Sequence, residues 1–417
     1  MKRNKIFTLM LIVVSMAMGF SSCIGNDDDY NNNQKPTIDP VTYADKDIYL
    51  NMSMTAYPFF SQVNSSVEKN KNFMISPLGM TEVLTMLVHG ANGNTAAQIN
   101  KVMNTPWILP AHIMDAMKSL NDFLPKADSK TALAIANSQW IDEGYDVKND
   151  YIKNNIDKLD AETFTQLLST EATKNDINSW CARKTNGLIK AFLKSPLQQN
   201  TRMVLLNALY FKSSWASAFD KKNTFDAEFH GENGDDKVPF MHQTEIFTYG
   251  EVDGNQYVVL PYKSDEYRMV ICLPSENAEI STLLGALDAD TFRNAVFSRR
   301  TSKVALSLPK FRVNTALTLN GILRALGVQR AFTGTADFSG ITGSSVAVDE
   351  VRQKCFVEVS EEGTEAAAVT SIGVRFTSVM PEDRPVVMNV NRPFVFAIVD
   401  SETADILFAG KIGTIEK

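Results

Sequence analysis

The stretch from residue 361 to residue 378 decides the fold, and it reads EEGTEAAAVTSIGVRFTS. It begins like a helix, with acidic residues followed by three alanines, and alanine is the best helix former. It ends in residues that favour strands, among them Val374, Phe376 and Thr377. Conflicting propensities within one short segment often mark a functional site. An ordinary exposed strand or a linker is the alternative interpretation.

Read with the period of two that describes a strand, this stretch has one uncharged face. That face carries Thr364, Ala366, Ala368, Thr370, Ile372, Val374 and Phe376. The charged residues Glu365 and Arg375 lie on the opposite face, together with Ala367 and Val369. The pattern predicts a strand with one buried face, although the start of the stretch would also tolerate a helix or an open loop.

The N-terminal segment has the layout of an export signal. A positively charged start precedes an apolar run over residues 6–20, which is too short and wrongly flanked for a transmembrane helix. Two serines directly before Cys23 resemble the cleavage box of bacterial lipoproteins. We therefore predict that residues 1–22 are a signal peptide and that Cys23 is lipidated. Ordinary signal cleavage with an idle Cys23 is the alternative.

Residues 23–44 are polar and acidic, and they cannot bury enough apolar surface to order themselves. They predict a flexible tether, whose acidic run resembles the surface-export signal of some Gram-negative lipoproteins; a plain solvated linker is the alternative. Residues 45–417 contain no second linker and no repeat, which predicts a single domain. We expect an exported outer-membrane lipoprotein that faces the periplasm or the cell surface and contacts the membrane only through its lipid.

Hydrophobic periodicity predicts helices in the first part of this domain and strands in the rest. The expected helices include residues 77–88 and 177–193, and the expected strands cover residues 203–211, 257–261, 268–273, 303–308 and 394–399. Helices followed by many strands, without regular alternation, indicate an α+β fold with largely antiparallel sheets.

Charge and cysteine content argue against two classes of protein. The chain has 41 Lys and Arg against 48 Asp and Glu, a net charge of -7, and no basic stripe that would neutralise phosphates, so we expect no nucleic-acid partner. Apart from Cys23, only Cys181, Cys272 and Cys355 remain, in apolar or helical contexts. This odd number predicts buried free thiols and no disulfide framework.

Motifs for catalysis are missing from the sequence. The four histidines have no zinc-type spacing, and neither a Gly-x-Ser-x-Gly elbow nor a complete phosphate loop is present. We therefore expect no catalytic residue, no metal and no cofactor. Because a triad can be assembled from distant residues, a hydrolase stays as a weaker alternative.

Residues 361–370 closely resemble the hinge of the reactive-centre loop in the serpin family, where an acid pair, a glycine and a threonine precede a run of small residues. Further stretches from about residue 45 to about residue 413 resemble family motifs in the same order. Among them are residues 72–77, 90–95, 207–212, 308–311 and 392–394. The resemblance implies the serpin fold, an α+β arrangement of helices around mostly antiparallel sheets with an exposed, mobile reactive-centre loop.

The resemblance also implies a function without catalysis by this chain. Serpins inhibit serine proteases, and some cysteine proteases, as suicide substrates: the protease cleaves the loop, and the loop inserts as a new strand while the acyl-enzyme is trapped. The implied hinge consists of Glu361, Glu362, Gly363, Thr364, Glu365, Ala366, Ala367, Ala368, Val369 and Thr370. Its inward face is small and uncharged, as burial requires. A serpin-fold binding protein, or a plain protease substrate, is the alternative function.

The usual family spacing from Glu361 places the reactive bond between Thr377 and Ser378. A small β-branched residue before the bond suggests elastase-like or subtilisin-like targets. In a looser register, Phe376 would suit chymotrypsin-like proteases and Arg375 trypsin-like ones.

The resemblance further assigns residues that control the sheet. Ser76 and Asn207 match positions that govern its opening, and Trp215 matches the point of first insertion. Many family members carry a histidine two residues before the strand that leads to the hinge, where this chain has Gln353. Glutamine forms hydrogen bonds but does not titrate, so we expect no pH-sensitive gate at this position. We expect the protein to be a monomer.

Overall fold

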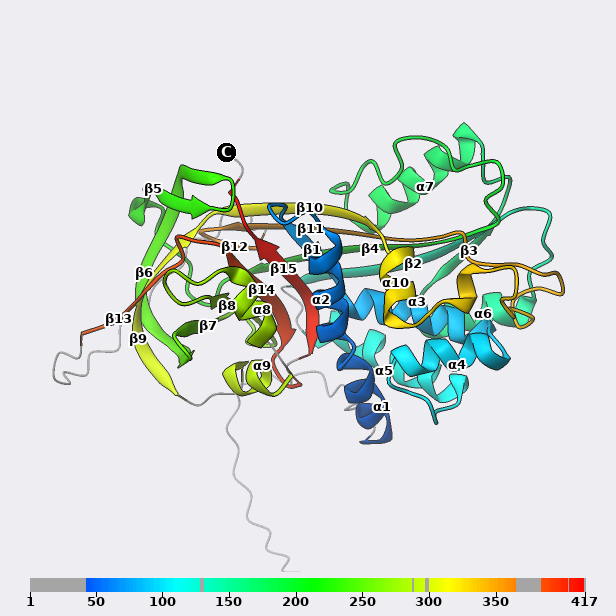
Figure 1. Cartoon of the computed structure of the whole chain (residues 1–417), viewed down its shortest axis with the longest axis horizontal. Helices are drawn as coiled ribbons and strands as arrows, with labels where there is room; N and C mark the ends of the chain where they lie inside the picture. Colours follow the sequence, from blue (N-terminus) through cyan, green and yellow to red (C-terminus); the bar gives the residue numbers. More distant parts are fainter. Residues whose placement is uncertain are drawn as a thin grey trace, which may run out of the picture. The chain divides into compact units, whose positions relative to one another are not determined.

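The computed structural model describes residues 43–127, 131–286, 289–296, 300–364, 384–403 and 405–415. They belong to one compact unit, which spans Pro40–Lys417. Two β-sheets form its framework, and helices cover the smaller sheet on both faces (Figure 1).

The larger sheet has nine strands among the described residues, in the order β1-β15-β14-β8-β7-β6-β9-β13, with β5 paired to β6. Within it, β13 and β9 are parallel and the other pairs are antiparallel. The strands are β1 (Phe73–Ile75), β5 (Thr224–Gly231), β6 (Gly234–Val252), β7 (Asn255–Pro261), β8 (Tyr267–Leu273), β9 (Thr301–Pro309), β13 (Val386–Asn389), β14 (Phe394–Asp400) and β15 (Ile406–Ile412).

The smaller sheet has the order β10-β11-β12-β4-β2-β3 in the described part of the chain, and β11 also pairs with β4. The β11–β4 and β2–β3 pairs are parallel, and the others are antiparallel. The strands are β2 (Ala132–Ile141), β3 (Glu162–Thr165), β4 (Met203–Ser214), β10 (Phe311–Thr318), β11 (Glu350–Ser360) and β12 (Gly363–Thr364).

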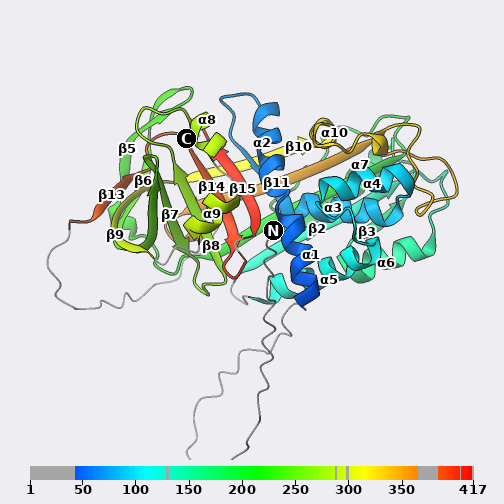
Figure 2. The same ribbon diagram turned by 60° about the horizontal axis from the view of Figure 1, so that its bottom comes forward.

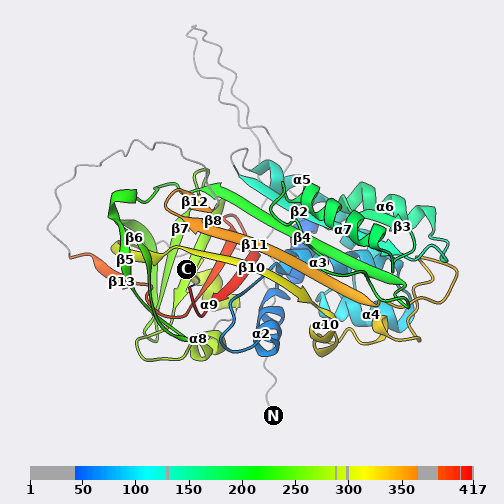
Figure 3. The same ribbon diagram turned by 90° about the horizontal axis from the view of Figure 1, so that it is seen from above.

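Helix α7 lies on one face of the smaller sheet, and α3 to α6 lie on the other (Figures 1 and 3). Two apolar clusters fill these layers, and β4 contributes alternate residues to each. None of the helices in the described ranges is long and apolar enough to cross a membrane. The helices are α1 (Tyr43–Ser53), α2 (Ala56–Ser66), α3 (Pro77–Gly90), α4 (Gly93–Val102), α5 (Pro110–Ala127), α6 (Asn149–Leu159), α7 (Glu171–Lys184), α8 (Ile280–Ala286), α9 (Ala289–Val296) and α10 (Asn320–Leu326).

Helix α3 is the central helix of the layer beneath the smaller sheet (Figure 2). Ser76 caps its N-terminus by accepting a hydrogen bond from Gly79 N at 3.0 Å, and Pro77 occupies the first turn, where its missing N–H costs nothing. Every residue of α3 except His89 is buried. A helix that is buried on all sides reads as apolar throughout, so the polar residues it does contain are informative.

The predicted α+β class is confirmed, and the five predicted strands lie within β4, β7, β8, β9 and β14. The helix predicted over residues 177–193 is wrong in its extent, because α7 ends at Lys184. Asn186 and Gly187 adopt positive φ angles of 50° and 81°, which stop the helix. Ile189 and Leu193 are still buried, so their apolar spacing misled the prediction. Cys181, Cys272 and Cys355 are buried and free, as expected.

Strand β12 occupies one end of a position between β4 and β11. Gly363 and Thr364 pair antiparallel with Ser214 and Ser213 of β4 on one side, and with the end of β11 on the other. Farther along, β4 and β11 pair directly with each other in parallel, from Tyr210 with Phe356 onward. The smaller sheet is therefore open at one end and closed along the rest of these two strands.

Gly363 is required by the close approach of β12 to β4. Its φ angle is 147°, a conformation that residues with a side chain rarely adopt. A Cβ atom at this position would lie 2.2 Å from the carbonyl oxygen of Ser213. Backbone strain and a backbone clash thus act together, and the sequence offers the one residue type that avoids both.

We predict that Gly363→Ala detaches β12 from β4 and lowers the free energy of unfolding by about 1–3 kcal/mol, the usual cost of a strained backbone conformation. Urea unfolding measures this loss. Gly321→Ala is the matched control, because no atom lies within 4 Å of the added Cβ and its φ is not positive. Equal stability of the two variants would show that β12 does not need glycine.

Candidate functional site

Two lysines hold the acid pair that precedes β12. The carboxylate of Glu361 is nearly buried and lies 2.9 Å from Lys310 Nζ. Burial raises the pKa of Glu361, but hydrogen bonds led by that from Lys310 outweigh burial and hold the pKa below its usual value. Glu362 Oε1 lies 2.6 Å from Lys221 Nζ, and this hydrogen bond raises the pKa of the lysine. The hinge is thus fixed where it leaves β11.

Trp215 and Tyr262 hold the chain around the turn into β12. Their rings stack, with centroids 4.7 Å apart. Trp215 Nε1 donates to the carbonyl oxygen of Ser360 at 2.9 Å, and its backbone N donates to that of Glu362 at 3.1 Å. The Tyr262 hydroxyl lies 2.6 Å from Thr364 Oγ1, which is fully buried. The predicted insertion residue Trp215 therefore contacts the predicted hinge.

Ser76, Asn207 and Gln353 meet in the core where β4 and β11 pair, and we call these three residues the central polar cluster. Gln353 Nε2 donates to the carbonyl oxygen of Ser76 and to Asn207 Oδ1, each at 2.9 Å. Gln353 Oε1 accepts from Ser76 N at 2.8 Å. All three residues are buried. One glutamine side chain thus joins α3, β4 and β11.

The expected place of Gln353, two residues before the strand that leads to the hinge, is wrong. It lies inside β11, which begins at Glu350. Alternate residues of β11 are buried from Val351 onward, and Gln353 belongs to this inward set. The strand therefore starts earlier because its alternation starts earlier, and the side chain of Gln353 is part of the sheet contact itself.

Two residues that the sequence analysis missed extend the central polar cluster beneath the sheet. Asn207 Nδ2 donates to Asn137 Oδ1 on β2 at 2.7 Å, and Asn137 Nδ2 donates to the carboxyl group of Glu82 on α3. Burial raises the pKa of Glu82 to about 8. The available sequence signal is the single acidic residue in a mostly apolar helix. Lys310 lies in the family-like motif at residues 308–311, but the local sequence marks neither it nor Lys221 or Tyr262 as a partner of the hinge.

The remaining predicted site residues fall outside the described residues. These are the rest of the hinge, the reactive bond with its alternatives, and the lipidation site: Glu365, Ala366, Ala367, Ala368, Val369, Thr370, Arg375, Phe376, Thr377, Ser378 and Cys23.

A serine and a histidine lie in contact on neighbouring strands of the larger sheet. Ser307 Oγ is 2.8 Å from His242 Nδ1, and the two residues are register partners on β9 and β6. The Phe225 ring stacks on His242 with centroids 4.0 Å apart. Within the described ranges, His242 Nε2 has no hydrogen-bond partner, so no carboxylate orients the imidazole as a catalytic triad requires. The contact is a cross-strand pair.

Glu228, His230 and Asp235 bring their ligand atoms within 4.8 Å of one another at the β5–β6 hairpin. All three residues are exposed, and His230 Nδ1 lies 3.0 Å from Asp235 Oδ1. Three exposed ligands fall short of the four that a structural zinc site needs. Among the described residues, this is the group of acids and a histidine whose ligand atoms lie close together, and it does not include the hinge.

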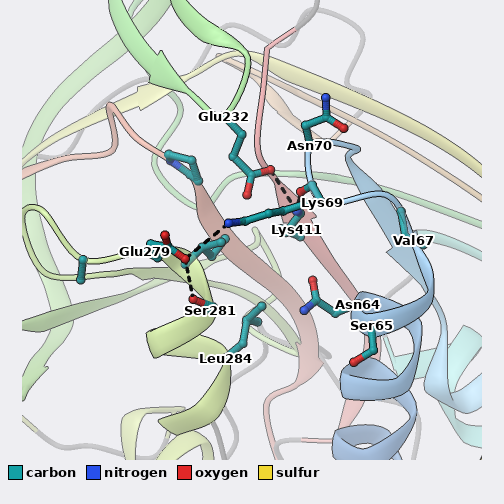
Figure 4. Close-up of a pocket in the computed structure, with 13 residues that line it drawn as sticks. Asn64, Ser65, Val67, Lys69, Asn70, Glu232, Glu279, Ser281, Leu284 and Lys411 are labelled. Carbon is teal, nitrogen blue, oxygen red and sulfur yellow. Dashed lines mark hydrogen bonds and ion pairs between the residues drawn. The ribbon is translucent and has the colours of Figure 1, made fainter.

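A pocket of about 560 Å³ lies between α2 and α8 (Figure 4). Its charged groups already pair with each other: Lys411 Nζ lies 3.0 Å from Glu232 Oε2, and Lys69 Nζ lies 3.5 Å from Glu279 Oε2. The pocket therefore presents neutralised charges to any ligand.

Comparison with known proteins agrees with this architecture. The family model described as Serpin (serine protease inhibitor) matches residues 51–414. An uncharacterised serpin-like protein of Thermococcus kodakarensis is 33% identical, covering 97% of this chain and 98% of its own. Leukocyte elastase inhibitor A of Mus musculus is 31% identical, covering 86% of this chain and 97% of its own.

The structural comparison points the same way. The crystal structure of the thermophilic serpin tengpin in its native state superposes with a TM-score of 0.81 and 30% sequence identity, covering 89% of this chain and 94% of that chain. With the sheet, the hinge and the family match in agreement, this chain belongs to the serpin family, whose members are in general protease inhibitors and not catalysts.

Proposed function

We propose that this protein is a suicide-substrate inhibitor of serine proteases, which traps the acyl-enzyme by inserting its cleaved loop between β4 and β11. Cysteine proteases are a second target class. The observation that carries the proposal is β12, which already fills one end of that position. Insertion of the following residues has to separate β4 from β11 along their direct pairing, which runs from Tyr210 and Phe356 to Val204 and Glu350.

The register of β12 predicts where each following residue enters. Thr364 lies opposite Ser213 on β4 and Val359 on β11. Because the new strand is antiparallel to both neighbours, each step forward along it moves one residue back along each of them. Continued in this register, the neighbours are Phe211 and Val357 for Ala366, Leu209 and Cys355 for Ala368, and Asn207 and Gln353 for Thr370.

The side chains on these three rows complement one another. The alanines enter between apolar residues, of which Phe211 and Leu209 on β4 are large, so a bulky side chain would find little room. Thr370 enters at the row of the central polar cluster and parts Asn207 from Gln353, whose amides are joined at 2.9 Å. A threonine hydroxyl both donates and accepts, so it offers each separated amide a new partner.

The free-energy contributions of hydrogen bonds and apolar burial favour the inserted state. Insertion replaces one ladder of hydrogen bonds between β4 and β11 by two ladders, and each added bond contributes about 1 kcal/mol net. Burial of apolar side chains such as Ile372 and Val374 contributes about 1.5–3 kcal/mol each. The lost amide contact between Asn207 and Gln353 costs about 1 kcal/mol, which the threonine partly restores.

The proposed target is an elastase-like or subtilisin-like protease that cleaves between Thr377 and Ser378. The small residue before this bond supports the assignment, as does the relationship to a protein named for inhibiting leukocyte elastase. Cleavage after Phe376 by chymotrypsin-like enzymes, or after Arg375 by trypsin-like enzymes, is the second assignment.

A binding function is the alternative, and two pockets among the described residues give it little support. The apolar pocket bounded by α2 and β14, with Tyr57, Phe60 and Phe292 in its lining, has a volume of about 60 Å³. Drug-sized ligands need roughly 300–1,000 Å³. In the larger pocket near Lys411, the charged groups of Lys411, Glu232, Lys69 and Glu279 are paired with each other, so these four groups are not free to orient a ligand.

We also propose that the inhibitor is anchored outside the cytoplasm by a lipid on Cys23 and acts as a monomer. The charged start, the short apolar run and the paired serines before Cys23 support export and lipidation. A surface or periplasmic location would place the loop where foreign proteases arrive.

We predict a covalent complex with a target protease that survives boiling in detergent and is visible by gel electrophoresis. Arginines at Ala366 and Ala368 should abolish it while loop cleavage continues, because each would bury an unpaired charge. Glu365→Arg is the matched control. In the continued register its neighbours are the half-buried Lys212 on β4 and the exposed Glu358 on β11, so the added arginine stays on the charged, outward face. If the unmodified protein is cleaved and every protease stays active, the proposed inhibition is contradicted.

In the same reactions, the mass of the released C-terminal fragment identifies the cleaved bond. Cleavage away from residues 375–378 would refute the assignment of the reactive bond.

For the anchor, mass spectrometry of the mature protein should find a lipid-modified cysteine, residue 23, at the N-terminus, and Cys23→Ser should release the protein from membranes. An unmodified N-terminus at another residue would contradict the proposed anchor.

A further inference from the structure

Glu82 is a carboxylic acid enclosed in the core directly beneath the contact that closes the smaller sheet. It lies on α3 with 1% of its surface exposed. Among the described residues, no lysine or arginine forms an ion pair with it. A buried acid without a cation is costly when ionised, so its presence needs an explanation. The proposed inhibition mechanism does not use it.

Hydrogen bonds connect Glu82 to the sheet contact in one direction. Gln353 donates to Asn207, Asn207 donates to Asn137, and Asn137 donates to Glu82. Each amide uses its NH₂ group toward the next residue, and the carboxyl group is the final acceptor. We call these four residues, which span β11, β4, β2 and α3, the amide relay. A change in the protonation of Glu82 therefore affects, through these hydrogen bonds, the contact between Gln353 and Asn207 that insertion has to break.

Groups from the packed helices complete the surroundings of Glu82. The Asn121 side chain on α5 also hydrogen-bonds the carboxyl group, while Asn121 Oδ1 has no partner among the described residues. Directly after α6, Asp160 is the charged group that acts on Glu82, and the buried hydroxyl of Tyr151 on α6 donates to Gln139 of β2. Burial, aided by Asp160, keeps the pKa of Glu82 near 8 against the opposing hydrogen bonds.

We propose that Glu82 is a proton-dependent lock on the smaller sheet: the neutral acid stabilises the closed contact between β4 and β11, and the carboxylate favours its opening. The neutral acid forms hydrogen bonds on both sides of the enclosed site. It accepts a hydrogen bond from Asn137, and its O–H donates to Asn121 Oδ1 after the side-chain amide of Asn121 rotates to face it. The carboxylate is favoured in any state that admits water to α3, and separation of β4 from β11 is such a state. This inference rests on the proposed function, because sheet opening matters only if the loop inserts.

The sign of the pH dependence follows from the raised pKa. An ordinary glutamate has a pKa of 4.5, and Glu82 in the closed sheet has a pKa of about 8. The stabilising contribution of the neutral acid is therefore complete below about pH 4.5 and is lost as the pH rises through about 8. Sheet opening should become easier over the same range. A glutamine at position 353 does not titrate, so the pH response of the closed contact would come from α3.

The test measures sheet opening in the full chain without any protease. A fluorescent peptide with the sequence of residues 366–376 is mixed with the intact protein, and its incorporation as the missing strand is followed on native gels. The rate should rise about ten-fold between about pH 7 and pH 9, as the ionised fraction of a group with a pKa near 8 does. Glu82→Gln keeps the hydrogen bonds of the neutral acid, so it should show the slow rate at both pH values.

Glu143→Gln, which removes an exposed carboxylate from the turn after β2, is the matched control and should retain the ten-fold rise. Urea unfolding at both pH values is the second readout, and the midpoint should fall with pH in the unmodified protein more than in Glu82→Gln. A rise that persists in Glu82→Gln, a rate that does not change with pH, or a peptide that never incorporates would overturn the lock. If the peptide behaves as predicted but no protease is trapped, the lock stands and the proposed function fails.

Discussion

The parallel pairing of β4 with β11 is the constraint on which the rest of the site depends. It closes most of the smaller sheet, whereas the β12 end of the same two strands already holds a third strand between them. Gln353 stabilises this pairing through hydrogen bonds to Ser76 and Asn207, the other members of the central polar cluster. Opening this contact leaves buried amides without partners, at a cost of about 1–3 kcal/mol each, and a new hydrogen-bond partner offsets this cost. A sheet held in this way is stable yet able to accept one more strand.

The hinge is held at one end by charge and close packing. Glu361 and Glu362 are paired with lysines, Trp215 and Tyr262 surround the turn, and Gly363 fits where no Cβ could. These contacts fix the register from which insertion would proceed. The same register aligns the alanines with apolar neighbours and Thr370 with the central polar cluster. The hinge and the central polar cluster are therefore aligned along the same strand position between β4 and β11, and Glu82 lies beneath the central polar cluster.

Much of this could be predicted from the sequence, because the decisive features are local. The uncharged alternate face, the glycine after two acids and the strand periodicities are all visible in short windows. The error at residues 177–193 arose because apolar spacing continues past Asn186 and Gly187, whose backbone conformations end the helix. The partners Lys310, Lys221 and Tyr262, and the relay from Asn137 to Glu82, join segments far apart in the chain. Only the folded arrangement shows which of many lysines and amides meet.

The central claim, that β4 and β11 must separate for the protease to be trapped, is tested most directly by tying them together. Leu206 and Arg352 are register partners on the two strands, so cysteines at both positions are placed to form a disulfide across the pairing. Oxidised protein should be cleaved by its target without trapping it, and reduction should restore the covalent complex. If the oxidised protein still traps the protease, insertion between β4 and β11 is not the mechanism.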